Sequence, residues 1–288
     1  MAATAHGRPQ EAGRALTGAL RELDRLPDGD ADCTRLRIRV LMAQASCDFE
    51  RSGLPAALST LDGGAQLAEQ LADGELVALC HSQRAMLYGR SGMMAAALPE
   101  LDAAVGDLRL LTPRDRWVLL LNRGILHSHR GAFAEAAADL TQAEREAATA
   151  GLVRERALAL HDRGYVAYLT GDLPLALDLM GAAGRREADL PPEVRLDHGR
   201  VLLEAGLIHE AVETLTAAAG ECTNRRQLQV LGEIHLDLAR AHGLLGDVER
   251  GLALARSARD RFRRRGATVW AARCEVVGLG LALARGTR

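Results

Sequence analysis

The sequence predicts an all-α fold, a right-handed superhelical solenoid of antiparallel helix pairs with a period of about 40 residues. Glycines recur at a nearly constant spacing, and small residues recur at fixed offsets on both sides of them. The composition agrees with helices. Hydrophobic residues make up 48% of the chain and aromatic residues only 3%, so the core must consist of Leu, Ala and Val, which suits close-packed helices better than strands.

Each predicted turn between paired helices contains a glycine. Successive turn glycines are separated by 46, 39, 39, 40, 35, 40 and 40 residues. Glycine suits a sharp turn because it adopts backbone conformations that strain other residues. The turn glycines are Gly7, Gly53, Gly92, Gly131, Gly171, Gly206, Gly246 and Gly286.

Small residues flank these glycines in the helices on either side. Seven residues before the turn stand Ser46, Ala85, Gly124, Gly164, Gly199 and Ala239, although Leu279 precedes Gly286. Five residues after it stand Ala12, Ala97, Ala136, Ala176, Ala211 and Gly251, with Leu58 and the preceding Ala57 as the exception. Twelve residues after it stand Ala19, Ala65, Ala104, Ala143, Ala183, Ala218 and Ala258. Small residues on two helices allow close ridge-into-groove packing.

Larger apolar residues stand nine places after most turns, among them Leu140, Met180 and Leu215. We expect these side chains to fill the space between one hairpin and the next. A single hairpin of this kind cannot bury its apolar face alone, so the hairpins must stack.

This pattern resembles the tetratricopeptide repeat, in which a small residue, a turn, an Ala, a large apolar residue and a second Ala recur at these offsets. The best match runs from Arg163 through Gly171 to Ala183. The resemblance covers nearly the whole chain and implies a stack of helical hairpins. The period here is longer than the family's usual length of about 34 residues, and the family's aromatic positions are mostly aliphatic.

We therefore expect a single array over residues 1–288. A half-repeat spans 7–26 and a terminal helix spans 267–285. Because Gly7 and Gly286 each lack one of their two helices, we expect that the chain is a piece of a longer protein or has a mis-assigned start. The repeats between the two ends span about 33–72, 75–111, 113–150, 152–189, 193–221 and 224–265.

Charge and cysteine content argue against several functions. The net charge is −2, so no global basic field attracts nucleic acid or an anionic membrane. The five cysteines form no CxxC pair, and no histidine pair has metal-ligand spacing, so we expect no metal and no cofactor. Cys80 and His81 are neighbours whose side chains diverge on a helix, which disfavours a catalytic pair. The absence of a secretory signal makes the cytoplasm the default compartment.

A finer resemblance concerns what the array is attached to. Three segments, 121–124, 161–164 and 190–197, look like the helical array that precedes a caspase-like CHAT peptidase domain in actinobacterial proteins. The abundance of Ala and Gly and the complete absence of Lys indicate a G+C-rich genome. The longer period also resembles arrays in bacterial signalling ATPases and peptide-sensing regulators, although no P-loop or helix-turn-helix is visible. Both resemblances imply a platform rather than an enzyme.

The first helix of each hairpin is expected to line a concave groove, with positions 13, 10, 6, 3 and 2 before each turn glycine facing it. We expect this groove to bind a peptide or protein segment. Tyr165 and Tyr168 either anchor the partner or fill the hairpin core. The candidate groove residues are Leu121, Ile125, His129, His161, Tyr165, Tyr168, Arg200 and Glu204.

Charged residues also recur at fixed offsets before the turns, which predicts an inter-repeat ladder such as Arg123 to Asp162 and Arg163 to Asp197. The sequence thus predicts a protein-interaction scaffold, regulatory and originally attached to an effector domain such as a CHAT peptidase. The alternative is a peptide- or small-ligand-sensing array of a bacterial transcription or signalling regulator.

Overall fold

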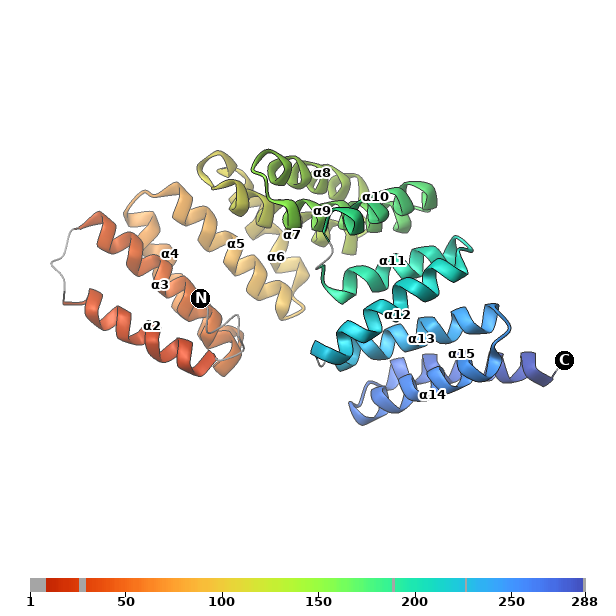
Figure 1. Ribbon diagram of the computed structural model, residues 1–288. Coiled ribbons are helices and arrows are strands. Elements are labelled where there is room, and N and C mark those ends of the chain that lie inside the picture. The colour runs from red at the N-terminus through yellow and green to blue at the C-terminus, as the bar shows by residue number, and fades with distance from the viewer. Residues whose placement is uncertain (1–8, 26–29, 188–189, 226, 287–288) are drawn as a thin grey trace. The chain divides into compact units, whose positions relative to one another are not determined.

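The computed structural model describes residues 9–25, 30–187, 190–225 and 227–286, which form fourteen α-helices, one short 3₁₀-helix and no strand (Figure 1). The predicted all-α helical-repeat fold is confirmed. No described helix is both long and apolar enough to cross a membrane. The α-helices are α2 (Pro9–Leu23), α3 (Ala31–Ser52), α4 (Leu54–Gln70), α5 (Gly74–Arg90), α6 (Met94–Val105), α7 (Pro113–His129), α8 (Phe133–Thr149), α9 (Val153–Leu169), α10 (Leu173–Arg186), α11 (Pro192–Glu204), α12 (Ile208–Arg225), α13 (Leu228–Leu244), α14 (Val248–Arg264) and α15 (Thr268–Gly286).

The helices belong to two compact units, each of which is described by itself. Unit 1 comprises residues 1–151 and contains α2 to α8, and unit 2 comprises residues 152–288 and contains α9 to α15. Consecutive helices pair into hairpins: α3–α4, α5–α6 and α7–α8 in unit 1, and α9–α10, α11–α12 and α13–α14 in unit 2 (Figure 1). Helix α11 begins at Pro192, directly after Pro191, and is only 13 residues long.

Glycines with left-handed backbone conformations make the turns of these hairpins. The φ angle of Gly171 is +86° and that of Gly206 is +78°, a region that side chains disfavour. Gly53, Gly92, Gly131 and Gly246 share this conformation, so six of the predicted turn glycines are confirmed. Gly7 lies outside the described residues. Gly286 is the last residue of α15, and the residues that would complete its predicted turn lie outside the described part of the chain.

The glycines at the seventh position before the turn allow the two helices of a hairpin to touch. A Cβ atom added to Gly164 would lie 2.8 Å from Met180 Cγ, and one added to Gly199 would lie 2.6 Å from Leu215 Cγ. Met180 and Leu215 therefore pack inside their own hairpins. Both side chains also belong to core clusters that include the next hairpin, Met180 with Val201 of α11 and Leu215 with Ile234 of α13. The expected place between hairpins is therefore only one part of their packing, because each one also occupies the room that the missing side chain of its own hairpin leaves.

The alanines that stand twelve residues after the turn glycines are buried in most second helices. In α4 the buried position is one residue earlier. Ala104, Ala143, Ala183, Ala218 and Ala258 are fully buried. In α4, however, Ala65 is only half-buried and the neighbouring Gly64 is buried instead. The reason is the turn. α4 begins directly after Gly53, whereas the other second helices begin two residues after their turn glycines, so its buried face comes one residue early.

Candidate functional site

A groove of about 760 Å³ runs along the first helices of unit 2 and α15. Its lining residues come from α9, α11, α13 and α15, so every successive first helix contributes. One wall of the groove is apolar and the other is charged.

The apolar wall belongs mainly to α15. Val269 and Val276 are 67% and 69% exposed, and the buried Leu236 of α13 belongs to the same lining. The ring of Trp270 stacks on the buried ring of Phe262, with centroids 5.4 Å apart and an interplanar angle of 20°. The guanidinium of Arg273 lies 4.7 Å from the centroid of Trp270, a cation–π contact. Trp270 is therefore held in place between two neighbours.

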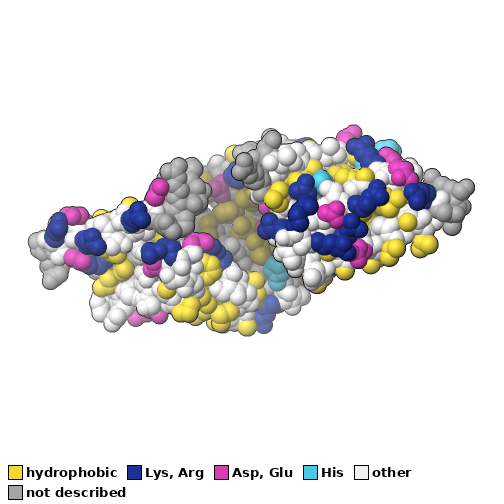
Figure 2. All heavy atoms as spheres, turned by 90° about the horizontal axis from the view of Figure 1, so that it is seen from below, with side chains coloured by type: hydrophobic (Ala, Val, Ile, Leu, Met, Phe, Trp, Pro, Cys, Tyr) yellow, Lys and Arg dark blue, Asp and Glu magenta, His cyan; other side chains and the backbone are white. Residues whose placement is uncertain are grey.

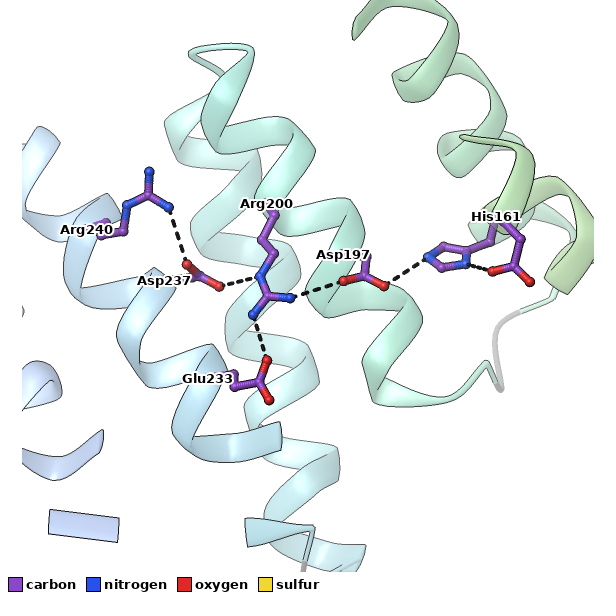
Figure 3. Close-up of polar contacts among 7 residues, drawn as sticks. His161, Asp197, Arg200, Glu233, Asp237 and Arg240 are labelled. Atoms are coloured by element: carbon purple, nitrogen blue, oxygen red, sulfur yellow. Dashed lines mark hydrogen bonds and ion pairs between the residues drawn. The ribbon is translucent and has the colours of Figure 1, made fainter. Parts of the chain in front are cut away.

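The charged wall is centred on Arg200 of α11 (Figure 3). Its Nε donates to Asp237 Oδ2 at 2.9 Å, its Nη2 donates to Glu233 Oε2 at 2.8 Å, and its Nη1 donates to Asp197 Oδ1 at 3.3 Å. Burial disfavours the cation, but these carboxylates outweigh it and raise the pKa of Arg200 above its usual range. Arg200 is therefore permanently charged, and its ion pairs link α11 to α13.

Two further contacts extend this charged wall along α13 and α11. Arg240 Nη2 donates to Glu204 Oε1 at 3.0 Å, and Arg240 Nη1 lies 3.5 Å from Asp237 Oδ1. Asp237 is nearly fully buried, and it accepts from Arg200 and Arg240 together. Because Arg240 and Glu204 are each about half exposed, this end of the wall is open to a ligand.

His161 of α9 lies at the other end of the charged wall, buried between two carboxylates (Figure 3). Its Nδ1 is 3.0 Å from Asp162 Oδ1, and its Nε2 is 3.6 Å from Asp197 Oδ2, which is an ion-pair distance rather than a hydrogen bond. Burial acts to lower the pKa of His161, but the contact with Asp162 and the charges of Asp162 and Asp197 outweigh it and raise the pKa above the ordinary value. A charged chain thus links α9, α11 and α13.

Five of the sequence-predicted residues lie in unit 2, and three of those line the groove together, namely Tyr168, Arg200 and Glu204. His161 is buried and joins the groove only through Asp197 and Arg200. Tyr165 and Tyr168 both pack against the core cluster that contains Met180, with their ring centroids 6.1 Å apart. Tyr168 therefore serves both the core and the groove.

The other three predicted residues lie on α7 of unit 1. Ile125 and His129 line a smaller pocket of about 210 Å³ together with Met86 of α5 and Met94 of α6. Leu121 lies one turn before Ile125 and is half-buried. Of the eight predicted residues, three thus line the groove of unit 2, two line the pocket of unit 1 and three line neither.

The groove contains several residues that the sequence prediction missed, chiefly Trp270, Arg273 and Val276 on α15. The signal was present for two of them, because Arg273 and Val276 stand 13 and 10 residues before Gly286. Offsets of 10 and 6 before Gly246 give Leu236 and Arg240. Trp270 lies outside these offsets, and its role depends on its contact with Phe262.

Inter-repeat ion pairs exist, but the predicted partners differ. Asp197 is contacted by His161 and by Arg200, three residues along its own helix. In unit 1, Arg123 makes a two-point contact with Asp139 of α8 at 2.6 and 2.7 Å and also reaches Asp102 of α6. The charged residues at fixed offsets before the turns do face neighbouring helices, as predicted. The offsets did not predict which charge pairs with which, because long side chains reach one helical turn in either direction.

The Cys80–His81 pair does not have the arrangement of a nucleophile and its base. Burial raises the pKa of the Cys80 thiol to about 11, whereas a nucleophilic cysteine needs a lowered pKa. His81 Nδ1 lies 2.7 Å from Glu100 Oε2 instead. Within the part of the chain that the structure describes, no group of three or more His, Cys, Asp or Glu side chains could hold a metal ion.

The fold and the groove define a helical-repeat protein of the tetratricopeptide type, and comparison with solved structures agrees at the level of the fold. No family model and no curated protein matches the chain. A signal-transduction ATPase with a tetratricopeptide-repeat sensor from Pyrococcus horikoshii is similar, with 13% identity and a TM-score of 0.73 over 95% of this chain and 42% of that one. The chain therefore spans less than half of that protein.

Two further solved structures are similar over most of their own length. BtubC from P. vanneervenii is 18% identical, with a TM-score of 0.65 over 73% of this chain and 89% of that chain. The Rap conjugation gene regulator of the plasmid pLS20, in complex with the Phr* peptide, is 14% identical, with a TM-score of 0.58 over 90% of this chain and 78% of that chain. These similarities show the tetratricopeptide-type fold.

Proposed function

We propose that the chain is a regulatory binding scaffold, without catalytic activity of its own, that holds a peptide or protein segment in the groove of unit 2. The observation that carries this proposal is the pairing of an exposed apolar wall, anchored by Trp270, with a charged wall that ends in Arg240 and Glu204. Apolar and aromatic anchors provide most of the affinity of such interfaces, and peripheral charges orient the ligand. The Rap neighbour in complex with a peptide supports a ligand of this class.

The finer proposals concern the protein context. Attachment to an effector domain such as a CHAT peptidase, in a cytoplasmic protein of an actinobacterium, rests on the resemblance of the repeat segments. The alternative, a peptide- or small-ligand-sensing array of a signalling or transcription regulator, is favoured by the sensor and Rap neighbours. Coding sequence beside this chain separates the two, because a protease domain supports the first and a DNA-binding or ATPase domain supports the second. We expect no nucleic-acid or membrane partner at the groove.

Selection of peptides from a random display library on the full chain tests the groove. Selected peptides are expected to lose at least about tenfold in affinity on Trp270→Ala, since tenfold corresponds to about 1.4 kcal/mol and a buried aromatic anchor is worth more than that. Val276→Glu is a second variant whose exposed position leaves folding intact.

Met86→Ala, in the pocket of unit 1, is the matched control and should leave affinity unchanged. Peptides that are insensitive to both groove variants, or a library that yields no binder to the folded chain, would overturn the proposal.

A further inference from the structure

Positive charge is concentrated at the last two helices. Residues 248–286 contain nine arginines and three carboxylates, a net charge of +6, whereas the whole chain has a net charge of −2. The remainder of the chain therefore has a net charge of −8. Such an asymmetry within one chain creates a strong local field that attracts an oppositely charged partner.

All three carboxylates of this region already have an arginine partner. Asp260 pairs with Arg259 at 2.9 Å, Glu249 pairs with Arg285 at 2.9 Å, and Glu275 pairs with Arg263. Figure 2, the view from below, shows arginine side chains lying among apolar side chains on the face of unit 2 that is turned to the reader. Within the described part of the chain, six arginines of the region have no carboxylate partner: Arg250, Arg256, Arg261, Arg264, Arg265 and Arg273.

An apolar stripe runs along α15, and its first two residues also belong to the apolar wall of the groove. It consists of Val269, Val276, Leu279 and Leu283, each between 66% and 73% exposed. Their spacings of seven, three and four residues place them on one face of the helix, as in the seam of a coiled coil. Exposed large aliphatic side chains gathered in this way mark an interaction surface.

A hollow of about 330 Å³ lies between α14 and α15 next to the α15 stripe. Its apolar lining consists of Leu252 and Ala255 of α14 and Cys274, Gly278 and Leu279 of α15. Its charged lining consists of Arg256, Arg259 and Glu275, and Glu275 is paired with Arg263. A hollow of this kind accepts a protruding side chain from a facing helix, and the arginines can pair with a carboxylate beside that side chain.

Leu279 also distinguishes this surface from the inside of a hairpin. It stands seven residues before Gly286, where complete hairpins have Ala, Ser or Gly. In the α11–α12 hairpin that residue is Gly199. Because it has no side chain, α12 approaches so closely that a Cβ added to Gly199 would lie 2.6 Å from Leu215. A leucine prevents such an approach, so the α15 stripe suits a wider seam with large side chains on both sides.

We propose that the α15 stripe and the neighbouring arginines form a docking surface for an acidic amphipathic helix of a partner protein. The stripe and the hollow account for an apolar helical face. Arg256 at the hollow, Arg273 on α15 and the net charge of +6 over residues 248–286 account for acidic flanks. A second copy of this chain is disfavoured because docking through the same surface would oppose two regions of +6 charge. Nucleic acid would leave the stripe without an apolar partner, and a lipid surface has no side chain to fill the hollow.

Fluorescence anisotropy with two labelled designed peptides tests this proposal on the full chain. Both peptides are amphipathic helices with leucine at the seam positions, and they differ only in having glutamate or lysine on the flanks. The glutamate peptide is expected to bind, with an affinity that falls as salt is added, and the lysine peptide to bind at least tenfold more weakly. Leu279→Ser and the double variant Arg256→Glu/Arg259→Glu, whose two arginines line the hollow, are each expected to weaken the glutamate peptide at least tenfold.

Matched controls lie elsewhere on the chain. Leu244→Ser removes an equally exposed leucine from α13, and Arg109→Glu reverses an exposed charge in unit 1, so neither should change the affinity. Arg240→Ala, on the charged wall that α13 contributes to the groove, reports on the groove alone and is expected to leave this binding within twofold, which separates the two proposals. The docking proposal is overturned if the glutamate peptide fails to bind or binds no better than the lysine peptide. Dimerisation that Leu279→Ser abolishes, or tighter binding of anionic vesicles or duplex DNA to the same residues, would also overturn it.

Discussion

His161 is the buried residue of unit 2 whose charge depends most directly on its neighbours. Because its pKa is raised in the folded chain, the folded state binds the proton more tightly than the unfolded state does. This contribution to stability is fully present below the ordinary pKa of 6.5 and is lost as the pH rises through the raised value. Burial also raises the pKa of Asp197, so that carboxyl contributes in the same direction over a more acidic interval.

Stability measured by urea unfolding is therefore expected to fall as the pH rises above about 6.5. His161→Gln should flatten this slope, whereas His129→Gln, at an exposed position in unit 1, should leave it unchanged. Titration of the His161 ring protons by NMR provides a direct check. A midpoint at or below 6.5 would contradict the assignment of Asp162 and Asp197 as its stabilising partners.

The sequence predicted groove residues only where a helical face determines the position of a side chain. Tyr168, Arg200 and Glu204 were found because they share offsets from turn glycines, and offsets on a helix define a face. The burial of His161 could not be found in this way, since it depends on Asp197 of the next hairpin. The same reason applies to Trp270, which depends on the ring of Phe262.

The spacing between the two helices of a hairpin depends on one small residue. Gly199 on α11 faces Leu215 on α12, which is fully buried and has no room to move. Gly199→Ala is expected to destabilise the chain by about 1–3 kcal/mol, the usual cost of an overpacked core. Gly220→Ala, in the same hairpin but with open space around it, should instead stabilise by about 0.5–1 kcal/mol because it removes backbone freedom from the unfolded chain.

Urea unfolding followed by circular dichroism measures both changes. Equal effects of the two substitutions would show that the close approach at Gly199 does not limit the hairpin. A compensating substitution, Leu215→Val, is expected to recover part of the loss in Gly199→Ala by removing one methylene from the crowded contact.

At the scale of helices, the periodic pattern was sufficient to predict the hairpins, because turn glycines and small columns directly determine close helix packing. It failed where a turn changed length. Ala65 matched the column in sequence, but α4 begins one residue early and buries Gly64. The pattern also did not predict that Met180 and Leu215 pack against the glycines of their own hairpins as well as toward the next one, since an offset cannot tell how many neighbouring helices a side chain contacts.

At the scale of the whole molecule, a stack of hairpins should lose structure locally, because each hairpin in a helical repeat contacts only its neighbours. Gly124→Ala in unit 1 places a Cβ 2.7 Å from Leu140 Cγ, and Gly199→Ala does the same to Leu215 in unit 2. Amide hydrogen exchange followed by mass spectrometry is expected to show lost protection in α5–α8 for the first variant and in α9–α14 for the second. Each variant should leave the helices of the other unit protected as in the wild type. Loss of protection throughout both units from either substitution would mean that the chain unfolds as one cooperative body, and binding at the groove would then be coupled to the stability of every hairpin.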